Sequence, residues 1–362
     1  MSAPRRNTHF AATALGASAL AVVGALLVGG SGPVVADAPR LPEVQDEFDS
    51  LGPDVHAAKL PSGRTAHYTD AGPRDGRPVL FIGGTGTSAR AQHMTDFFAS
   101  TRDSMGLRLI SVERNGFGDT EFDPALGKAD FVSDALAVLD RLDVEKVSVI
   151  AISGGGPYAA ELAARAPERV RALHLAAALP PYGAKPEYCA LSDEALADAL
   201  GPVVKDPRKW WAMPDDSPAK SIPGFADTAY EEGARTFNQR GQQGDVAPQV
   251  HEQRLYCDRP GPDLSGLKAP AFLYAGEKDT TVPPSTLDAW RAALPGEEVV
   301  RRYADTGHDV QYRHWDQILA DLAGHGDRTV VCRESDSELL PAREADRLVE
   351  EGEATLGSCA WQ

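Results

Sequence analysis

Short apolar runs of strand type alternate along this chain with segments whose apolar residues recur at helical spacing. Buried strands are predicted where such a run ends in a polar or Gly-rich turn: Pro78–Ile82, Leu107–Val112, Lys146–Ile152, Val170–Ala178, Ala271–Ala275 and Val299–Tyr303. Arg64–Thr69 alternates like an edge strand, and helices are predicted at Ala89–Thr101, 128–142, Pro157–Ala166 and Val310–Leu322. The alternation predicts an α/β fold with a mostly parallel, doubly wound sheet that helices cover on both faces.

This regular pattern stops between Pro180 and about Leu267. The stretch contains Trp210-Trp211, several prolines and many polar residues. It predicts a helical cap inserted at the carboxyl edge of the sheet, where α/β proteins bind their ligands. The two tryptophans fit either an apolar acyl or alcohol pocket or the core of the cap itself. The predicted organisation is a signal peptide at 1–36, a core at 37–180 and 268–325, the cap at 181–267, and a C-terminal extension at 326–362 with one helix near Pro341–Gly352.

The N-terminus has the pattern of a secretory signal. Arg5-Arg6 precedes an apolar run from Phe10 to Val28, and small residues follow, so that cleavage is expected after Ala36 or, as the alternative, after Ala38. A run of this length can also be a retained membrane anchor, and the arginine pair can begin a twin-arginine signal. Each interpretation takes the chain out of the cytoplasm. We therefore expect a secreted, extracellular protein or, with a retained anchor, an external catalytic domain.

Four cysteines agree with an exported protein, because an even number in an oxidising compartment predicts disulfides. Cys189 and Cys257 both lie in the predicted cap, and Cys332 and Cys359 both lie in the C-terminal extension. We expect the local pairs 189–257 and 332–359, with four buried free thiols as the alternative. No CxxC motif or Cys/His spacing indicates zinc, so we expect no bound metal.

The net charge narrows the choice of partners. It is -17, with 53 acidic residues against 36 basic ones, and the sequence lacks the clustered Lys and Arg that phosphate binding requires. We therefore expect no nucleic-acid partner. A membrane is expected as a partner only if the N-terminal segment is retained as an anchor.

The strongest chemical signal is a serine placed between a strand and a helix. Val149-Ile150-Ala151-Ile152 runs directly into Ser153-Gly154-Gly155-Gly156, and a helix is predicted to begin at Pro157. A nucleophile elbow of the Gly-x-Ser-x-Gly type needs this arrangement, because the tight turn leaves no room for bulk two positions before and after the serine. Here Ala151 and Gly155 fill those positions. The alternative is a serine in an ordinary Gly-rich turn.

An acid and a histidine follow in the chain order expected after such an elbow. Asp279 comes in the turn after the predicted strand at 271–275, and His308 comes just after the last strand. Parallel strands present their carboxyl ends at one edge, so both residues are predicted to meet Ser153 there. Glu277 is the most plausible substitute for the acid, and Asp305 and Asp309 are weaker candidates because neither ends a strand.

With these motifs, residues 60–325 resemble the α/β-hydrolase superfamily, and in particular its capped, esterase-like bacterial serine hydrolases. Glu113-Arg114-Asn115-Gly116-Phe117-Gly118-Asp119-Thr120 is similar to the family's Asp-Arg-Pro-Gly-x-Gly-x-Ser turn, and Pro78–Gly84 to its oxyanion loop. The resemblance implies an α/β-hydrolase fold and an oxyanion hole formed by the N–H groups of Gly154 and Thr85. Gly83-Gly84 replaces the usual His-Gly, which leaves the register of Thr85 open by about one residue.

A competing motif lies in the same loop. Gly84-Thr85-Gly86-Thr87-Ser88-Ala89 matches G-x-G-x-x-A after a strand, and Glu113 ends the next strand, where a dinucleotide site would need an acid for the ribose. That interpretation leaves Ser153, Asp279 and His308 without a role, and it requires a cytoplasmic cofactor in an exported protein. We expect no cofactor.

The residues together predict an exported serine hydrolase whose substrate is a small-molecule ester or amide. Ser153 is expected to form an acyl-enzyme, with His308 as the base and Asp279 as its orienting acid. An ester of a small or medium organic acid is the first expectation and an amide the second. A lyase or C–C hydrolase on the same fold remains an alternative, because fold does not fix function. An exported, non-catalytic binding protein on a hydrolase scaffold is the alternative from another class.

Overall fold

The computed structural model describes residues 40–42, 52–210, 214–237 and 245–359. The predicted signal peptide at 1–36 and Trp211 of the cap lie outside these ranges. No helix within them is both long and apolar enough to span a bilayer.

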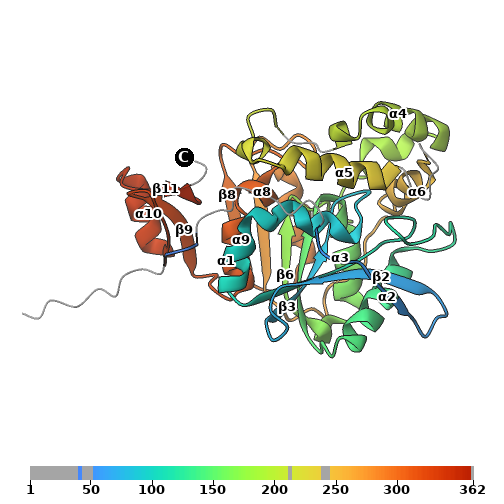
Figure 1. Cartoon of the computed structure of the whole chain (residues 1–362), viewed down its shortest axis with the longest axis horizontal. Coiled ribbons are helices and arrows are strands. Elements are labelled where there is room, and N and C mark those ends of the chain that lie inside the picture. The colour runs from blue at the N-terminus through green and yellow to red at the C-terminus, as the bar shows by residue number, and fades with distance from the viewer. Residues whose placement is uncertain (1–39, 43–51, 211–213, 238–244, 360–362) are drawn as a thin grey trace, which may run out of the picture. The chain divides into compact units, whose positions relative to one another are not determined.

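A twisted sheet forms the core (Figure 1). Its eight strands have the order β1-β2-β4-β3-β5-β6-β7-β8. β1 and β2 form an antiparallel hairpin, β2 is also antiparallel to β4, and all other neighbours are parallel. The strands are β1 (His56–Lys59), β2 (Thr65–Ala71), β3 (Arg77–Ile82), β4 (Leu107–Val112), β5 (Val147–Ile152), β6 (Val170–Ala176), β7 (Ala271–Gly276) and β8 (Glu298–Tyr303). The predicted doubly wound, mostly parallel sheet is confirmed.

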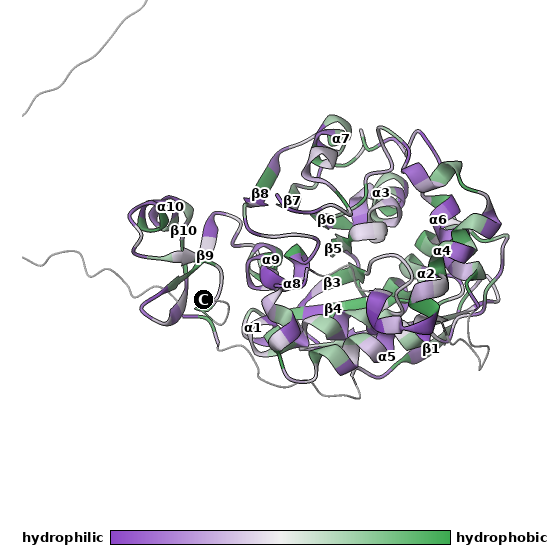
Figure 2. Ribbon diagram, turned by 90° about the horizontal axis from the view of Figure 1, so that it is seen from above, coloured by the Kyte–Doolittle hydropathy of each residue, from purple (hydrophilic) through white to green (hydrophobic). Residues whose placement is uncertain are grey.

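The central strands are buried on both faces, which explains why they are apolar throughout. Every residue of β5 and β7 is buried, and Figure 2 shows apolar colouring concentrated in the central strands. On one face of the sheet Leu80 and Ile82 belong to a cluster that includes α2 (Lys128–Arg141), α3 (Gly156–Arg165) and α7 (Leu287–Ala293). On the other face, Val79 and Phe81 pack in a cluster with the 3₁₀ helix η1 (Ala89–Phe98) and with α9 (Trp315–Leu322). Packing of helices on both faces fixes the positions of the central strands, and with them the carboxyl ends that lie at one edge of the sheet.

A helical cap is inserted between β6 and β7, and its helices lie beyond the carboxyl ends of the strands (Figure 1). Its three α-helices in the described ranges are α4 (Asp193–Lys205), α5 (Phe225–Phe237) and α6 (Ala247–Leu255). Cys189, in the 3₁₀ helix at Glu187–Ala190, is joined to Cys257, just after α6, as predicted. The two cysteines are separated by 68 positions, and closing a loop of that size stabilises the folded state by about 4 kcal/mol in the chain-entropy account.

The C-terminal extension forms a small sheet of its own. β9 (Arg328–Arg333) pairs with β10 (Asp336–Pro341) and with β11 (Thr355–Leu356), and α10 (Ala342–Glu350) packs beside them. The disulfide Cys332–Cys359 closes the unit, and this predicted pairing is also confirmed. The main-chain N–H of Val330 donates to the Gln317 side chain, and the Ser358 hydroxyl donates to Asp316. Both bonds join this unit to α9 of the core.

Two of the helices predicted beside the sheet differ in the structure, and α7 was not predicted. The segment expected as a helix at Ala89–Thr101 is a 3₁₀ helix up to Phe98, and α1 (Ala99–Ser104) begins only after it. The helix expected at Val310–Leu322 is broken at His314 into α8 (Val310–Arg313) and α9. The His314 ring stacks on Tyr303, with ring centroids 3.5 Å apart, and this tertiary contact outweighs the helical periodicity of the segment.

Candidate active site

Ser153 occupies a strained turn between β5 and α3. Its φ of 49° lies in the left-handed region that a residue with a Cβ rarely adopts. A Cβ added to Gly155 would lie 2.5 Å from the carbonyl oxygen of Ile82, and one added to Gly156 would lie 2.2 Å from that of Leu179. The neighbours of Ser153 must therefore be small, as the sequence pattern indicated. The turn lifts the serine side chain out of the end of the strand toward the cap.

The structure brings the hydroxyl of Ser153, the imidazole of His308 and the carboxylate of Asp279 into one hydrogen-bonded series. His308 Nε2 lies 3.1 Å from Ser153 Oγ, and His308 Nδ1 lies 2.8 Å from Asp279 Oδ2. The three residues follow β5, β8 and β7 respectively. The side chain of His308 is 11% exposed and that of Asp279 is 1% exposed. Three side chains distant in sequence thus meet at the carboxyl edge of the sheet.

The carboxylate of Asp279 is held by main-chain donors. Its Oδ1 accepts hydrogen bonds from the N–H groups of Thr281 and Val282, at 2.8 and 2.9 Å, which leaves Oδ2 facing the imidazole. The alternative acids lie elsewhere. Glu277 is paired with Arg302, Asp305 with Arg313, and Asp309 accepts a hydrogen bond from the N–H of Gly307.

The loop that carries His308 is held by hydrogen bonds that join Thr306 to Lys278 and His314. The main-chain carbonyl of Thr306 accepts a hydrogen bond from Lys278, and its hydroxyl lies 3.1 Å from His314 Nε2. Burial lowers the pKa of His314 to about 3, so this imidazole is neutral and supports the loop through hydrogen bonding and ring stacking. The hydrogen bond between Lys278 and Thr306 joins the loop after β7, which carries Asp279, to the loop after β8, which carries His308.

The Gly-rich loop after β3 lies against the serine turn. A Cβ added to Gly154 would lie 2.9 Å from the main-chain nitrogen of Thr85 and 2.1 Å from its hydroxyl, so that only glycine permits this approach. A Cβ added to Gly84 would lie 3.4 Å from Ser153 Cβ. The N–H of Thr85 makes no hydrogen bond to any residue in the described ranges. Thr85 and Gly154, the two residues inferred from the family resemblance, are therefore neighbours beside the serine.

A cavity of about 270 Å³ opens onto the serine and the histidine. Its described lining contains no Lys, Arg, Asp or Glu, and it mixes apolar side chains with hydroxyl and amide groups. Trp210 lines the cavity and also packs against the cap cluster of Leu196, Leu200 and Val250, so it fills both of the roles weighed for it. The lining residues are Phe81, Gly83, Gly84, Thr85, Thr87, Ala91, Thr95, Ile152, Ser153, Tyr188, Trp210, Gln253, Thr281, His308, Gln311 and Tyr312.

Glu113, the acid of the competing dinucleotide motif, is turned into the protein. Its carboxylate accepts hydrogen bonds from the N–H of Asp119 and the hydroxyl of Thr120, at 2.8 and 3.2 Å. Burial raises the pKa of Glu113 to about 7. A carboxyl group engaged in this way is not presented to a ribose at the mouth of the loop. Among the described residues, no group of three or more His, Cys, Asp or Glu side chains is placed to hold a metal ion.

Sequence reasoning missed a buried polar cluster behind the Gly-rich loop. Arg114 was noted only as part of a motif, and neither Glu252 of α6 nor Glu232 of α5 was singled out. Glu252 contacts Arg114 and the N–H of Gly86, and Glu232 contacts Ser88. A glutamate on a cap helix carries no local signal of such a role, because exposed glutamates are common on helices.

Comparison with known proteins gives matches over most of the chain. Residues 77–315 match the family model of the alpha/beta hydrolase fold. A 2-hydroxymuconate semialdehyde hydrolase from Pseudomonas putida is 36% identical over 126 residues, which cover 34% of this chain and only 43% of that relative. A non-heme chloroperoxidase from Streptomyces lividans is 35% identical over 281 residues, which cover 72% of this chain and 95% of that protein.

Solved structures agree on the architecture. An alpha/beta hydrolase fold protein from Chitinophaga pinensis superposes with a TM-score of 0.58, covering 76% of this chain and 98% of its own. Its sequence identity is 17%, so this likeness concerns the fold alone. Strands β3 to β8, the inserted cap and the three side chains lie within residues 77–315, which the family model matches.

Proposed function

Because the chain belongs to the α/β-hydrolase fold family, we propose that it is a serine hydrolase that cleaves carboxylic esters through an acyl-enzyme on Ser153. The observation that carries this proposal is the hydrogen-bonded series from the Ser153 hydroxyl through His308 to Asp279. A serine hydroxyl is a weak nucleophile until an oriented base removes its proton. The series supplies both the base and the group that orients it.

The proposed reaction has two halves. Ser153 Oγ attacks the ester carbonyl carbon while His308 Nε2 takes the proton of the hydroxyl. The protonated imidazole then gives that proton to the departing alcohol. In the second half His308 removes a proton from water, which attacks the acyl-enzyme, and the acid leaves as Ser153 regains its proton. Asp279 holds the Nδ1–H tautomer throughout. The N–H groups of Gly154 and Thr85 bind the oxyanion, and each such donor contributes about 3 kcal/mol to the transition state.

We infer from the cavity that the preferred ester is small and uncharged. The cavity volume of about 270 Å³ suits an ester with a short acyl chain and a small alcohol group. The absence of charged groups from its described lining disfavours a substrate carboxylate, because a desolvated carboxylate needs a cationic or strongly donating partner. Hydroxyl and amide groups such as Thr281, Gln253 and Gln311 can orient a neutral polar substituent.

A panel of p-nitrophenyl esters of rising acyl length tests the proposed substrate class. We expect kcat/KM to be highest for acetate and butyrate and to fall by at least about tenfold at dodecanoate, because the longer chain must leave the cavity. The matching p-nitroanilides serve as the amide arm. A maximum at dodecanoate or palmitate would refute the size argument, and no hydrolysis of any ester would favour a binding protein.

Cleavage of a carbon–carbon bond is the second candidate function. It is favoured by the relative named 2-hydroxymuconate semialdehyde hydrolase, which is 36% identical over 126 residues. Assaying 2-hydroxymuconate semialdehyde beside the ester panel separates the two functions, because the relative is named for that substrate. Turnover of 2-hydroxymuconate semialdehyde at a higher kcat/KM than that of every ester would replace the ester proposal.

We also propose that the protein is exported with its leader removed after Ala36. The N-terminal pattern and the two disulfides support this, because disulfides persist in oxidising compartments. Protein recovered from the culture medium is expected to begin at Asp37 and to show no thiol that alkylates without reductant. Recovery of the chain only from the membrane fraction, with its first residues intact, would favour the retained anchor.

A further inference from the structure

The Gly-rich loop at residues 83–88 depends on other parts of the chain for its conformation. It contains Gly83, Gly84 and Gly86, the last at a φ of 67°, and glycines leave a loop conformationally free unless outside contacts fix it. The position of the Thr85 N–H must nevertheless be fixed within a fraction of an ångström if it is to bind an oxyanion. The groups that hold the main chain on each side of Thr85 therefore control the proposed hole.

Two buried side chains hold that main chain. Arg114 donates to the carbonyl oxygens of Gly83 and Gly84, and Glu252 accepts the N–H of Gly86 at 2.6 Å through Oε2. The two side chains are themselves joined, with Arg114 Nε 2.6 Å from Glu252 Oε1. The carbonyl just before Thr85 and the N–H just after it are thus bound to one ion pair, which bridges the core and the cap.

This ion pair is almost completely removed from water. The exposed fractions of the side chains are 3% for Arg114 and 2% for Glu252. Burial alone would lower the pKa of Arg114, but the Glu252 carboxylate and nearby tyrosines outweigh it and raise that pKa. Desolvating two charges opposes folding, so a buried pair is a weak device for stability. Its value here lies in the directed hydrogen bonds that both charged groups make to the loop.

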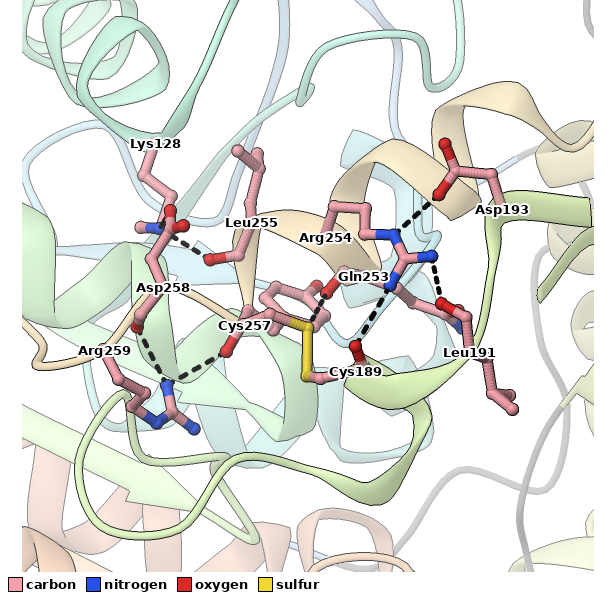
Figure 3. The surroundings of a disulfide bond; sticks show 11 residues. Lys128, Cys189, Leu191, Asp193, Gln253, Arg254, Leu255, Cys257, Asp258 and Arg259 are labelled. Atoms are coloured by element: carbon pink, nitrogen blue, oxygen red, sulfur yellow. Dashed lines mark hydrogen bonds and ion pairs between the residues drawn. A yellow bond between two sulfur atoms is a disulfide. The ribbon is translucent and has the colours of Figure 1, made fainter. Parts of the chain in front are cut away.

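The helix that carries Glu252 is itself anchored firmly. Figure 3 shows Arg254 reaching across to the first part of the cap, where it donates to Asp193 and to the carbonyl oxygen of Leu191, beside the disulfide of Cys189 and Cys257. Lys128 of the core donates to the carbonyl oxygen of Leu255, the last residue of α6. Glu252 therefore contacts the loop from a helix fixed both to the cap and to the core.

We propose that Arg114 and Glu252 are positioning residues that set the oxyanion hole, and that the cap acts on catalysis through α6 as well as by enclosing substrate. This inference rests on the proposed function of Ser153. Neither side chain lines the cavity, so neither is expected to touch substrate. Both act through the main chain around Thr85, and they should affect the transition state more than the bound substrate.

Glu252→Gln tests the proposal, because it keeps the size of the side chain and removes its charge. We expect kcat for p-nitrophenyl butyrate to fall about 10- to 100-fold while KM changes less than about twofold, since a misplaced donor weakens oxyanion binding alone. Affinity for a trifluoromethyl ketone, which forms an oxyanion on the serine, should fall in parallel with kcat. Glu194→Gln is the matched control: it makes the same change at an exposed position in the first turn of the cap helix α4, and kcat should stay within about threefold of the original value.

Hydrogen exchange of the 81–88 peptide measures the loop itself, independently of activity. We expect faster exchange in Glu252→Gln than in the unmodified protein or in Glu194→Gln, because the N–H of Gly86 loses its charged acceptor. If Glu252→Gln does not fold, the double variant Arg114→Met with Glu252→Met removes both charges together, a change that buried pairs often tolerate. The same losses are expected there.

Unchanged kcat together with unchanged exchange at 81–88 in a folded variant would overturn the positioning role. An unchanged kcat with a raised KM would overturn it as well, because that pattern marks lost substrate binding. If the unmodified protein cleaves no ester and reacts with no serine probe, the proposed function fails first. The exchange data then still decide whether Glu252 fixes the loop.

Discussion

Ser153→Ala is expected to lower kcat for p-nitrophenyl butyrate by about 10⁴- to 10⁶-fold, the loss typical of a triad that has lost its nucleophile. Alanine cannot form the acyl-enzyme, and what rate remains must come from water acting in the preformed oxyanion site. The variant should fold normally, since alanine fits the left-handed turn no worse than serine does at a φ of 49°. Initial rates of nitrophenol release measure the effect.

The control for this experiment is a serine outside the cavity. Ser192 caps the N-terminus of α4 through its side chain, so Ser192→Ala is expected to lower stability by about 1 kcal/mol and to leave kcat unchanged. Residual activity of Ser153→Ala within tenfold of the unmodified protein would mean that another residue is the nucleophile. Circular dichroism of both variants separates loss of chemistry from loss of fold.

Asp279→Asn is expected to lower kcat by about 10⁴-fold, because the asparagine amide donates to Nδ1 where the carboxylate accepts from it. The imidazole of His308 then carries its proton on Nε2, the atom 3.1 Å from the Ser153 hydroxyl, and can no longer accept one from it. Steady-state kinetics at alkaline and neutral pH measure the loss, with KM for the ester expected to change little.

Two neighbouring acids provide matched controls for Asp279. Glu277 lies in the loop that carries Asp279, and Asp305 lies in the loop that carries His308. Each of them pairs with an arginine and not with His308. Glu277→Gln and Asp305→Asn are expected to keep kcat within about threefold, because exposed ion pairs contribute little. If Glu277→Gln lost activity and Asp279→Asn kept it, the assignment of the orienting acid would be wrong.

The position of the site in the fold could be predicted because its signals are local. The serine turn needs small residues at Ala151 and Gly155 directly after a buried strand, and that pattern is visible within nine consecutive residues. Asp279 and His308 each follow a strand, and a parallel sheet gathers the carboxyl ends of its strands at one edge. Local patterns combined with this one rule were enough to place three distant side chains together.

The contacts that support the site could not be predicted, because they are set by tertiary packing. Glu252 and Arg114 are 138 positions apart, and no local pattern relates a cap helix to a core loop. The break at His314 has the same origin, since ring stacking on Tyr303 overrides a helical sequence. For the C-terminal extension the sequence predicted the one helix but not the strands, because runs as brief as Thr355–Leu356 give too few residues for periodicity to show.

Labelling with a fluorophosphonate probe, followed by peptide mapping, is the most direct test of an activated alcohol at position 153. The probe phosphonylates a serine only where a neighbouring base withdraws its proton and an oxyanion site receives the developing charge. We expect one adduct per chain, on the peptide that contains Ser153, and none in Ser153→Ala. An unlabelled Ser153 in folded protein, or a label that persists in Ser153→Ala, would contradict the account.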